Sequence, residues 1–564
     1  MNKRFLTPLC LIAIGAGTWS CIDDKYDLSD IDTTVQVKVD DLVIPINIDQ
    51  IDLESIIDLD EDGIVQVVDG AYTVVKGGTI DSDDINVDPI SIKCPNINPT
   101  VDEIHAVDAS GVTMQFPLST VSTRYSFKSN VITDKIEGLS TVYADFEIKI
   151  TFSLNPNPGG EITLSGVRVN LPKGLIIDEN YNKATGVYVA DKVNMVGGKA
   201  SLTIPVKGID FGAEYYAVNP FDAQTHIVAL DGELSIGGGT IDCKNSTLHR
   251  TLDFKVEYSF GTLDVRAIDG KINYPIDGVD ISRIDINDLP DVLSQPGTNI
   301  SLANPVIYFG INNPLQDCKL TASSGLSITA VRGGQASKTY SLDEDLTVGY
   351  GHADGEYNFM MCPAPNKVEK LDPEFPNPEK YVFSTLGNIL SGDGIPEALD
   401  VKFVNPGVRN QEVENLLVGH NYGSVHGKYK FVAPLQFDGQ SKIIYTDVMD
   451  GWYSEDMDYL TIETLVVDAT ISSNVPLTLD FTGYPIDKDG KRINNVAIEG
   501  AKVNANAKDQ KVSIRITGAV TGLDGVEFVA TAVAAPDSPA LSPDMKITLD
   551  HVRPCVSGYY QKEL

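Results

Sequence analysis

The sequence predicts a mainly β protein built from several tandem antiparallel β-sandwich-like domains with few short helices. Polar and apolar residues alternate in many short segments, most clearly at 144–152 (ADFEIKITF), as expected of strands with one buried face. Turn-forming residues separate these segments. Asp69-Gly70, between alternating runs at 64–68 and 71–75, is a strong hairpin signal. At 564 residues, 42% of them hydrophobic, the chain is long enough for several cores.

Composition and turn signals divide the chain into five expected parts. These are a signal segment at 1–20, an acidic β segment at 21–95, a β domain at 96–300, a β domain at 301–445 and a C-terminal β-sandwich-like domain at 446–564. The boundary between residues 300 and 301 follows a break at 295–298. A Pro-rich connector is expected at 363–377.

Further elements are expected after residue 280. Residues 379–390 (EKYVFSTLGNIL) predict a helix, because Val382, Leu386 and Leu390 recur on one helical face. The segment at 442–445 is expected to pair with a strand at 429–437. A short helix is also expected between 281 and 293.

The first residues have the pattern of a secretory signal. Lys3 and Arg4 precede a mainly apolar run at 6–16, which is too short to span a bilayer as a stable helix. Small residues then lead to Cys21, as in a bacterial lipoprotein signal that is cut before the cysteine to be lipidated. Thr18 stands where such signals usually have leucine. The alternative is simple secretion with an unmodified Cys21.

The residues that follow carry a resemblance. Cys21-Ile22-Asp23-Asp24-Lys25 resembles the start of surface lipoproteins from Gram-negative gut anaerobes. The resemblance implies that Asp23 and Asp24 act as an export tag and that a lipid on Cys21 anchors the protein to the outer face of the outer membrane. The periplasmic face is the alternative. Because the resemblance ends at Lys25, it concerns location and not fold.

Charge limits the partners that we expect. The formal net charge is −36, which argues against binding to nucleic acid and against an electrostatic hold on anionic lipid. The same charge favours solubility and cation binding. We therefore expect a membrane contact through the lipid on Cys21, and a glycan or protein ligand.

One acidic stretch matches the oxygen spacing of a calcium loop. Asp58, Asp60 and Asp62 take the first, third and fifth positions, Ile64 offers its carbonyl at the seventh, and Asp69 falls at the twelfth. The last position usually holds Glu, and a strand is expected to follow instead of a helix. The alternative is a solvated acidic turn, with Asp69-Gly70 serving the hairpin.

Cysteines are sparse in the expected mature chain. After Cys21 there remain Cys94, Cys243, Cys318, Cys362 and Cys555, with no CxxC motif, so zinc ribbons and redox motifs are not expected. One or two disulfides suit an oxidising envelope, and Cys318 with Cys362 is the pair closest in sequence. Buried free thiols are the alternative.

Sequence motifs do not point to catalysis. The chain has no phosphate loop, no GxSxG and no HExxH, so no catalytic residues are predicted. The favoured hypothesis is a non-enzymatic surface binding or adhesion protein. The alternative is a subunit that resembles fimbrillins, which are also acidic β lipoproteins, although the first Arg after Cys21 is Arg124, too far along to cut a short leader. An envelope glycan hydrolase is the least favoured class.

Overall fold

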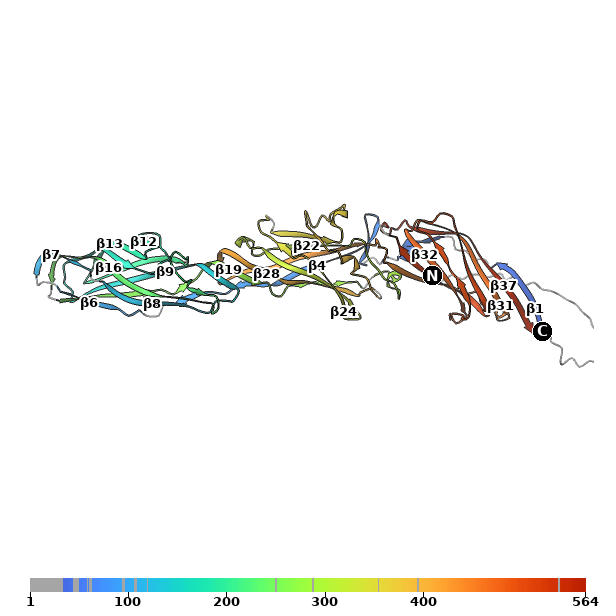
Figure 1. Ribbon diagram of the computed structural model, residues 1–564, viewed down its shortest axis with the longest axis horizontal. Coiled ribbons are helices and arrows are strands. Elements are labelled where there is room, and N and C mark those ends of the chain that lie inside the picture. Colours follow the sequence, from blue (N-terminus) through green and yellow to red (C-terminus); the bar gives the residue numbers. More distant parts are fainter. Residues whose placement is uncertain are drawn as a thin grey trace, which may run out of the picture.

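The computed structural model describes residues 34–43, 50–57, 59, 63–93, 97–105, 109–118, 120–248, 251–286, 289–352, 355–392, 395–535 and 538–563. These residues form a long rod of three β units in a row (Figure 1). Strands dominate, and they pair antiparallel except for β26 (Glu356–Cys362) with β27 (Glu379–Val382). The predicted fold class, mainly β with antiparallel sheets and few short helices, is confirmed.

The terminal unit, at the end of the rod where β1 and β37 are labelled, contains two facing sheets (Figure 1). Its buried side chains come from both sheets, including Ile462 and Ile516 on one and Leu523 and Val526 on the other. The six-stranded sheet contains β1 (Thr34–Val43), β2 (Gln50–Asp52), β31 (Leu460–Ser473), β33 (Ala497–Glu499), β35 (Gln510–Val520) and β37 (Lys546–Glu563). The four-stranded sheet contains β30 (Lys442–Met449), β32 (Leu477–Asp487), β34 (Ala501–Val503) and β36 (Leu523–Ala534).

The middle unit packs a seven-stranded sheet against part of an eleven-stranded sheet. Phe309 on the first and Phe403 on the second meet with ring centroids 5.7 Å apart. The seven strands are β3 (Val65–Val68), β4 (Ala71–Val87), β20 (Asp280–Ile281), β22 (Val306–Asn312), β26, β27 and β29 (His420–Pro434). The eleven-stranded sheet contributes β21 (Ile284–Asp285), β23 (Ala322–Arg332), β24 (Gln335–Ser341), β25 (Leu346–Val348) and β28 (Ala398–Leu417).

The distal unit lies at the opposite end of the rod from the terminal unit (Figure 1). Phe127 and Phe260 meet between its two sheets, with ring centroids 5.0 Å apart. Its nine-stranded sheet contains β5 (Ser91–Lys93), β7 (Ala109–Pro117), β8 (Val121–Ser129), β10 (Glu161–Asn170), β12 (Tyr181–Asn182), β13 (Val187–Met195), β15 (Phe221–Asp222), β16 (Ile227–Leu248) and β18 (Leu263–Asp264). The rest of the eleven-stranded sheet covers it, with β6 (Thr100–His105), β9 (Ile136–Asn155), β11 (Leu175–Ile176), β14 (Lys199–Asp210), β17 (Thr251–Phe260) and β19 (Ala267–Pro275).

The chain travels along the rod and back. β1 pairs with β37 in the terminal unit, β4 pairs with β29 in the middle unit, and β5 to β19 build the distal unit before the chain returns. The expected range 21–95 therefore contributes strands to all three units, and the first and last described strands lie side by side.

A continuous sheet joins the distal and middle units. β19 pairs with β9 on one side and with β28 on the other, so the hydrogen-bond ladder crosses the junction between the units. One cluster of buried apolar side chains also extends from Phe152 in the distal unit through Phe309 to Leu477 in the terminal unit. The packing of the rod is therefore uninterrupted across both junctions.

Local sequence explains many of these strands. In β9, Phe146, Ile148, Ile150 and Phe152 are buried while the residues between them face outward or are partly exposed, as the alternation predicts. The hairpin at Asp69-Gly70 is also confirmed, because β3 pairs with β4 and both turn residues have positive φ.

Helices are few and short among the described residues: α1 (Leu53–Ile56), α2 (Asp291–Ser294), η2 (Gln316–Cys318), η3 (Pro365–Lys367), η4 (Leu386–Asn388) and η5 (Glu455–Asp458). The helix predicted at 379–390 is wrong. Its residues form β27 and η4, because Tyr381 and Phe383 alternate into the core while Val382 is 60% exposed. Apolar side chains packed at period two, rather than along a helical face, stabilise the strand.

The strand partner predicted for residues 442–445 is also wrong. The segment at 442–445 belongs to β30, which pairs with β36 in the terminal unit and not with β29.

The cysteines that the structure describes, Cys243, Cys318, Cys362 and Cys555, are free thiols, so the Cys318–Cys362 disulfide does not form in this structure.

Candidate functional site

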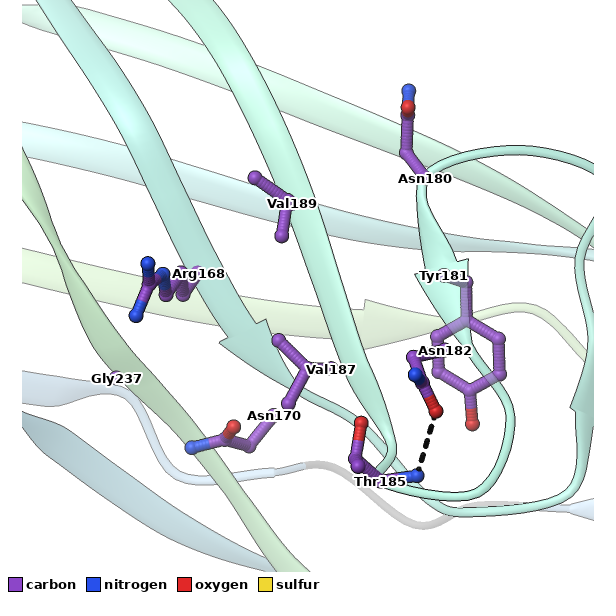
Figure 2. A pocket seen from close by; sticks show the side chains of 9 residues that line it. All are labelled: Arg168, Asn170, Asn180, Tyr181, Asn182, Thr185, Val187, Val189 and Gly237. Carbon is purple, nitrogen blue, oxygen red and sulfur yellow. Dashed lines mark hydrogen bonds between the residues drawn. The ribbon is translucent and has the colours of Figure 1, made fainter.

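A shallow polar hollow of about 750 Å³ lies on the flank of the distal unit. Figure 2 shows the side chains around it, which come from β10, β13, the turn and strand before β13, and β16. The lining residues are Arg168, Asn170, Asn180, Tyr181, Asn182, Thr185, Val187, Val189 and Gly237.

The floor of the hollow is the outer surface of the nine-stranded sheet. Across the β10–β13 pair, Arg168 is opposite Val189 and Asn170 is opposite Val187, so polar and apolar side chains lie in two adjoining rows. On its other side β10 pairs with β16, and the register of this pair shifts at a β-bulge near Gly237. A Cβ at Gly237 would lie 3.0 Å from Nδ2 of Asn170, so the missing side chain leaves this side open.

The β12–β13 hairpin forms the wall. Its turn is closed by a hydrogen bond from the Gly186 N–H to the Asn182 carbonyl, at 2.8 Å, and the Leu171 N–H donates to the Gly186 carbonyl, also at 2.8 Å. Gly186 has a φ of +76°, and a Cβ there would lie 2.6 Å from the Leu171 carbonyl oxygen, so the close approach requires glycine. The Tyr181 hydroxyl donates to the Pro172 carbonyl, which fixes the hairpin to the chain leaving β10.

The hydrogen bonds of the lining leave several polar groups available. Asn170 donates from Nδ2 to Ser235 Oγ at 2.8 Å, and Asn182 Oδ1 accepts the Thr185 N–H at 3.0 Å. Among the described residues, Arg168 has no hydrogen bond or ion pair. Burial raises the pKa of the Tyr181 hydroxyl, which therefore stays protonated and keeps its hydrogen bond to the Pro172 carbonyl.

These groups define what the hollow is able to do. They offer amide donors and acceptors, the Thr185 hydroxyl, one guanidinium and two valine side chains. None of the nine lining residues supplies a carboxylate, imidazole or thiol, the usual acids, bases and nucleophiles. The arrangement suits the binding of a polar ligand.

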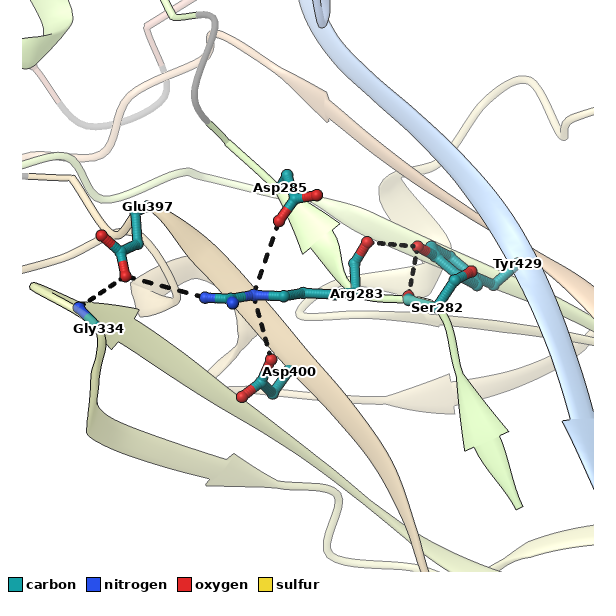
Figure 3. Close-up of polar contacts among 7 residues, drawn as sticks. All are labelled: Ser282, Arg283, Asp285, Gly334, Glu397, Asp400 and Tyr429. Atoms are coloured by element: carbon teal, nitrogen blue, oxygen red, sulfur yellow. Dashed lines mark hydrogen bonds and ion pairs between the residues drawn. The ribbon is translucent and has the colours of Figure 1, made fainter. Parts of the chain in front are cut away.

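A second polar cluster lies in the middle unit (Figure 3). The Arg283 guanidinium lies 3.4 Å from Asp400, 3.7 Å from Asp285 and 3.9 Å from Glu397. Arg283 lies between β20, which pairs with β4, and β21, which pairs with β28. The cluster therefore stabilises the segment that crosses from one sheet to the other.

Neighbouring hydrogen bonds support this structural role. Tyr429 donates from its hydroxyl to the Ser282 carbonyl at 2.7 Å, and Glu397 accepts the Gly334 N–H at 2.7 Å (Figure 3). All four charged side chains of the cluster are between 41% and 57% exposed, so solvent screens their attraction. Within the described ranges, no group of three or more His, Cys, Asp or Glu side chains is arranged to hold a metal.

The structure describes only part of the predicted calcium loop. Asp58, Asp60 and Asp62 lie outside the described residues, whereas Ile64 and Asp69 are placed. The Ile64 carbonyl accepts the Val75 N–H at 2.8 Å, and the Asp69 carboxylate pairs with Lys370 Nζ at 2.8 Å. Asp69 also forms the hairpin turn, and calcium binding stays a prediction.

The predicted anchor also lies outside the described residues. Cys21 and the export-tag residues Asp23 and Asp24 precede Thr34, the first residue that the structure describes. Cys94 is likewise outside the described residues. In the part of the chain that is described, no helix has the length and apolar character needed to cross a membrane.

Sequence reasoning missed the hollow. Two signals mark it in retrospect: the turn sequence at 180–186 (NYNKATG) and the three consecutive glycines at 237–239. Both are typical of loops and bulges in any β protein. Their proximity depends on the pairing of β10 with both β13 and β16, which local sequence does not specify.

Comparison with known proteins does not assign the chain to a family. Neither a family model nor a curated protein matches the sequence. A crystal structure of a Parabacteroides distasonis protein, provisionally described as secreted, is similar over 51% of this chain and 83% of its own, with 13% identity and a TM-score of 0.36. A structure of Broad Bean Stain Virus is similar over 50% of this chain and 85% of its own, with 10% identity and a TM-score of 0.13. Both likenesses are too slight to support an argument about function.

Proposed function

We propose that this protein is a lipid-anchored binding protein of the outer membrane that faces the cell exterior. In this proposal, Cys21 carries the anchor and the rod presents the distal hollow to a glycan or protein ligand. The observation that carries the proposal is the arrangement of the rod. The first described strand after Cys21, β1, lies in the terminal unit, whereas the hollow lies in the unit at the opposite end (Figure 1).

The continuity of the rod supports a presenting role. A flexible linker between units would let the distal unit fold back toward the membrane. Here β19 hydrogen-bonds to strands of both the distal and the middle unit, so bending at this junction would break ladder hydrogen bonds. The middle and terminal units are also joined, by hydrogen bonds from Tyr72 N–H to Leu541 O at 2.8 Å and from Leu541 N–H to Leu435 O at 3.0 Å.

The binding half of the proposal is tested by filling the hollow. Gly237→Val places a branched side chain against Asn170, and the φ of Gly237 lies outside the left-handed region. Gly261→Val is the matched control, because Gly261 is exposed in the same unit and its Cβ would have no neighbour closer than 3.9 Å. The probes are neutral polysaccharides, acidic polysaccharides and mucin, immobilised in parallel.

We expect at least one probe to retain the wild type and the Gly261→Val variant but to release Gly237→Val. Equal retention of all three proteins on every probe would contradict the binding role of the hollow.

The anchor is tested separately by protease shaving of intact cells. Wild type should be shaved, and Cys21→Ala should leave the membrane fraction. Protection of the wild type until the outer membrane is broken would place the protein on the periplasmic side.

A further inference from the structure

We infer that the ligand of the distal hollow is an acidic saccharide whose carboxylate pairs with Arg168. This inference rests on the proposed binding function and adds the chemical class of the ligand. Three features of the hollow carry it: the charge of its lining, the hydrogen-bonding groups that remain available, and the pairing of the strands beneath it.

The charge of the lining is opposite to that of the whole chain. The formal net charge is −36, with 79 Asp and Glu against 43 Lys and Arg, yet none of the nine lining residues is acidic. Arg168 has no ion pair among the described residues, whereas Arg409 pairs with Asp345 at 2.7 Å and Arg492 pairs with Glu527. The guanidinium at the hollow is therefore available to an external anion, and its planar fork matches a carboxylate.

The amides beside Arg168 suit sugar hydroxyls. After the bonds to Ser235 and Thr185 are counted, Oδ1 of Asn170 and Nδ2 of Asn182 have no hydrogen-bond partner among the described residues, which leaves an acceptor and a donor on two residues of the lining. A sugar hydroxyl both donates and accepts, so it satisfies either group. The half-exposed Val187 and Val189 offer apolar surface for the C–H face of a sugar ring.

Strand pairing argues against a peptide that binds by adding a strand. Such a peptide needs a sheet edge with unpaired backbone groups. Under the hollow, β10 is paired with both β13 and β16, and the first residues of β13 are paired with β12. The floor therefore presents side chains and not a free backbone edge, which favours recognition by side-chain hydrogen bonds and charge.

The experiment uses the full chain and defined probes. Oligosaccharides of galacturonate, glucuronate and mannuronate are titrated into the wild type by calorimetry, each beside its carboxyl-reduced counterpart. The variants are Arg168→Gln, which removes the charge, and Arg168→Lys, which keeps it. Arg515→Gln is the control, because Arg515 is an exposed strand arginine in the terminal unit.

We expect the wild type to bind at least one acidic oligosaccharide and to bind its reduced counterpart about ten- to a hundredfold more weakly, because a hydrogen-bonded charge is lost. Arg168→Gln should weaken acidic binding by a similar factor, Arg168→Lys should weaken it less, and Arg515→Gln should leave it unchanged. Rising salt should weaken wild-type binding more than Arg168→Gln binding.

Binding of none of the acidic probes, equal binding of the reduced probes, or an unchanged affinity in Arg168→Gln would overturn the inference. The two proposals fail in different ways. If a neutral glycan or mucin is still released by Gly237→Val, the binding function stands and only the acidic ligand is wrong. If Gly237→Val changes the retention of no probe, the binding function itself fails.

Discussion

The hydroxyl of Tyr143 donates a 2.6 Å hydrogen bond to Oδ2 of Asp269, at the junction between the distal and middle units. The other carboxylate oxygen of Asp269 accepts the Asn415 N–H at 2.7 Å. These residues lie in β9, β19 and β28, so one carboxylate connects three adjacent strands. Because the β19–β28 register shifts beside Asp269, side-chain bonds there replace part of the backbone ladder.

Removing this hydrogen bond should weaken the junction. Tyr143→Phe deletes the donor and leaves the Asp269 carboxylate with one partner fewer, which should cost about 1.5–3 kcal/mol of the free energy of unfolding, as for hydrogen bonds to charged groups. Denaturant unfolding measures the loss. Hydrogen exchange should increase first in β19 and in β28 near Asn415.

Tyr258 offers the matched control. It lies on β17, which pairs with β9, and its buried hydroxyl has no hydrogen-bond partner among the described residues. Tyr258→Phe therefore removes a buried polar group without breaking a bond, and the free energy of unfolding should stay the same or rise. If both variants lose equal stability, the Tyr143–Asp269 bond has no special role.

The junction should also respond to high pH. The hydrogen bond to Asp269, together with burial, raises the pKa of Tyr143 from 10.0 to about 12. The stabilisation of the folded protein by the Tyr143–Asp269 bond is fully present below pH 10. It is lost as the pH rises through 12, because ionised Tyr143 cannot donate to Asp269. The difference in unfolding free energy between the wild type and Tyr143→Phe should shrink between pH 10 and pH 12. A constant difference would contradict this account.

The wall of the hollow depends on Tyr181. Tyr181→Phe removes the hydroxyl that donates to the Pro172 carbonyl, at a cost of about 1 kcal/mol. The hairpin should loosen, so the Leu171 and Thr185 amides should exchange faster than in the wild type. Tyr188→Phe is the control, because Tyr188 is a partly buried tyrosine on β13 that does not line the hollow. Equal exchange in both variants would show that the Tyr181 bond does not hold the wall.

The first described strand should depend on one side chain. Val39 packs against the core of the terminal unit, whereas Val35 on the same strand is 43% exposed. Val39→Asp should loosen β1 from β37, because it places a charge at a partly buried position that packs against apolar side chains, and trypsin should then cut at Lys38. Val35→Asp should leave β1 paired. Equal resistance of the two variants to trypsin would contradict the pairing.

Sequence predicted the strands better than their arrangement. Residues 144–152 and 162–169 form strands because alternation follows directly from a sheet with one buried face. The helix at 379–390 failed because Leu386 and Leu390 fit a helical face, while Tyr381 and Phe383 pack at period two against the core. The tertiary environment therefore overrode the local pattern.

The path of the chain and the hollow were beyond local sequence. β1 pairs with β37 across nearly the whole chain, and no turn signal encodes such a contact. The hollow combines Arg168, the hairpin at 180–186 and Gly237, which are brought together only by strand order. The anchor prediction differs in this respect. The roles proposed for Cys21, Asp23 and Asp24 depend on a linear sequence signal, which is recognised without knowledge of the fold.

The proposed orientation of the rod is tested by measuring whether the distal unit lies away from the membrane. A fluorophore is attached at Val196→Cys, where the distal side chain is 83% exposed, or at Asp489→Cys, in an exposed turn of the terminal unit. This turn lies near the start of β31, because Lys488 Nζ is 5.0 Å from the Tyr453 ring, and Tyr453 bonds to Asp458. Cys94, Cys318 and Cys555 are replaced by Ser, and the lipidated chain is inserted into vesicles that carry a headgroup quencher. We expect quenching at position 489 and none at position 196. Equal quenching at both positions, or stronger quenching at 196, would contradict a rod that presents its hollow away from the membrane.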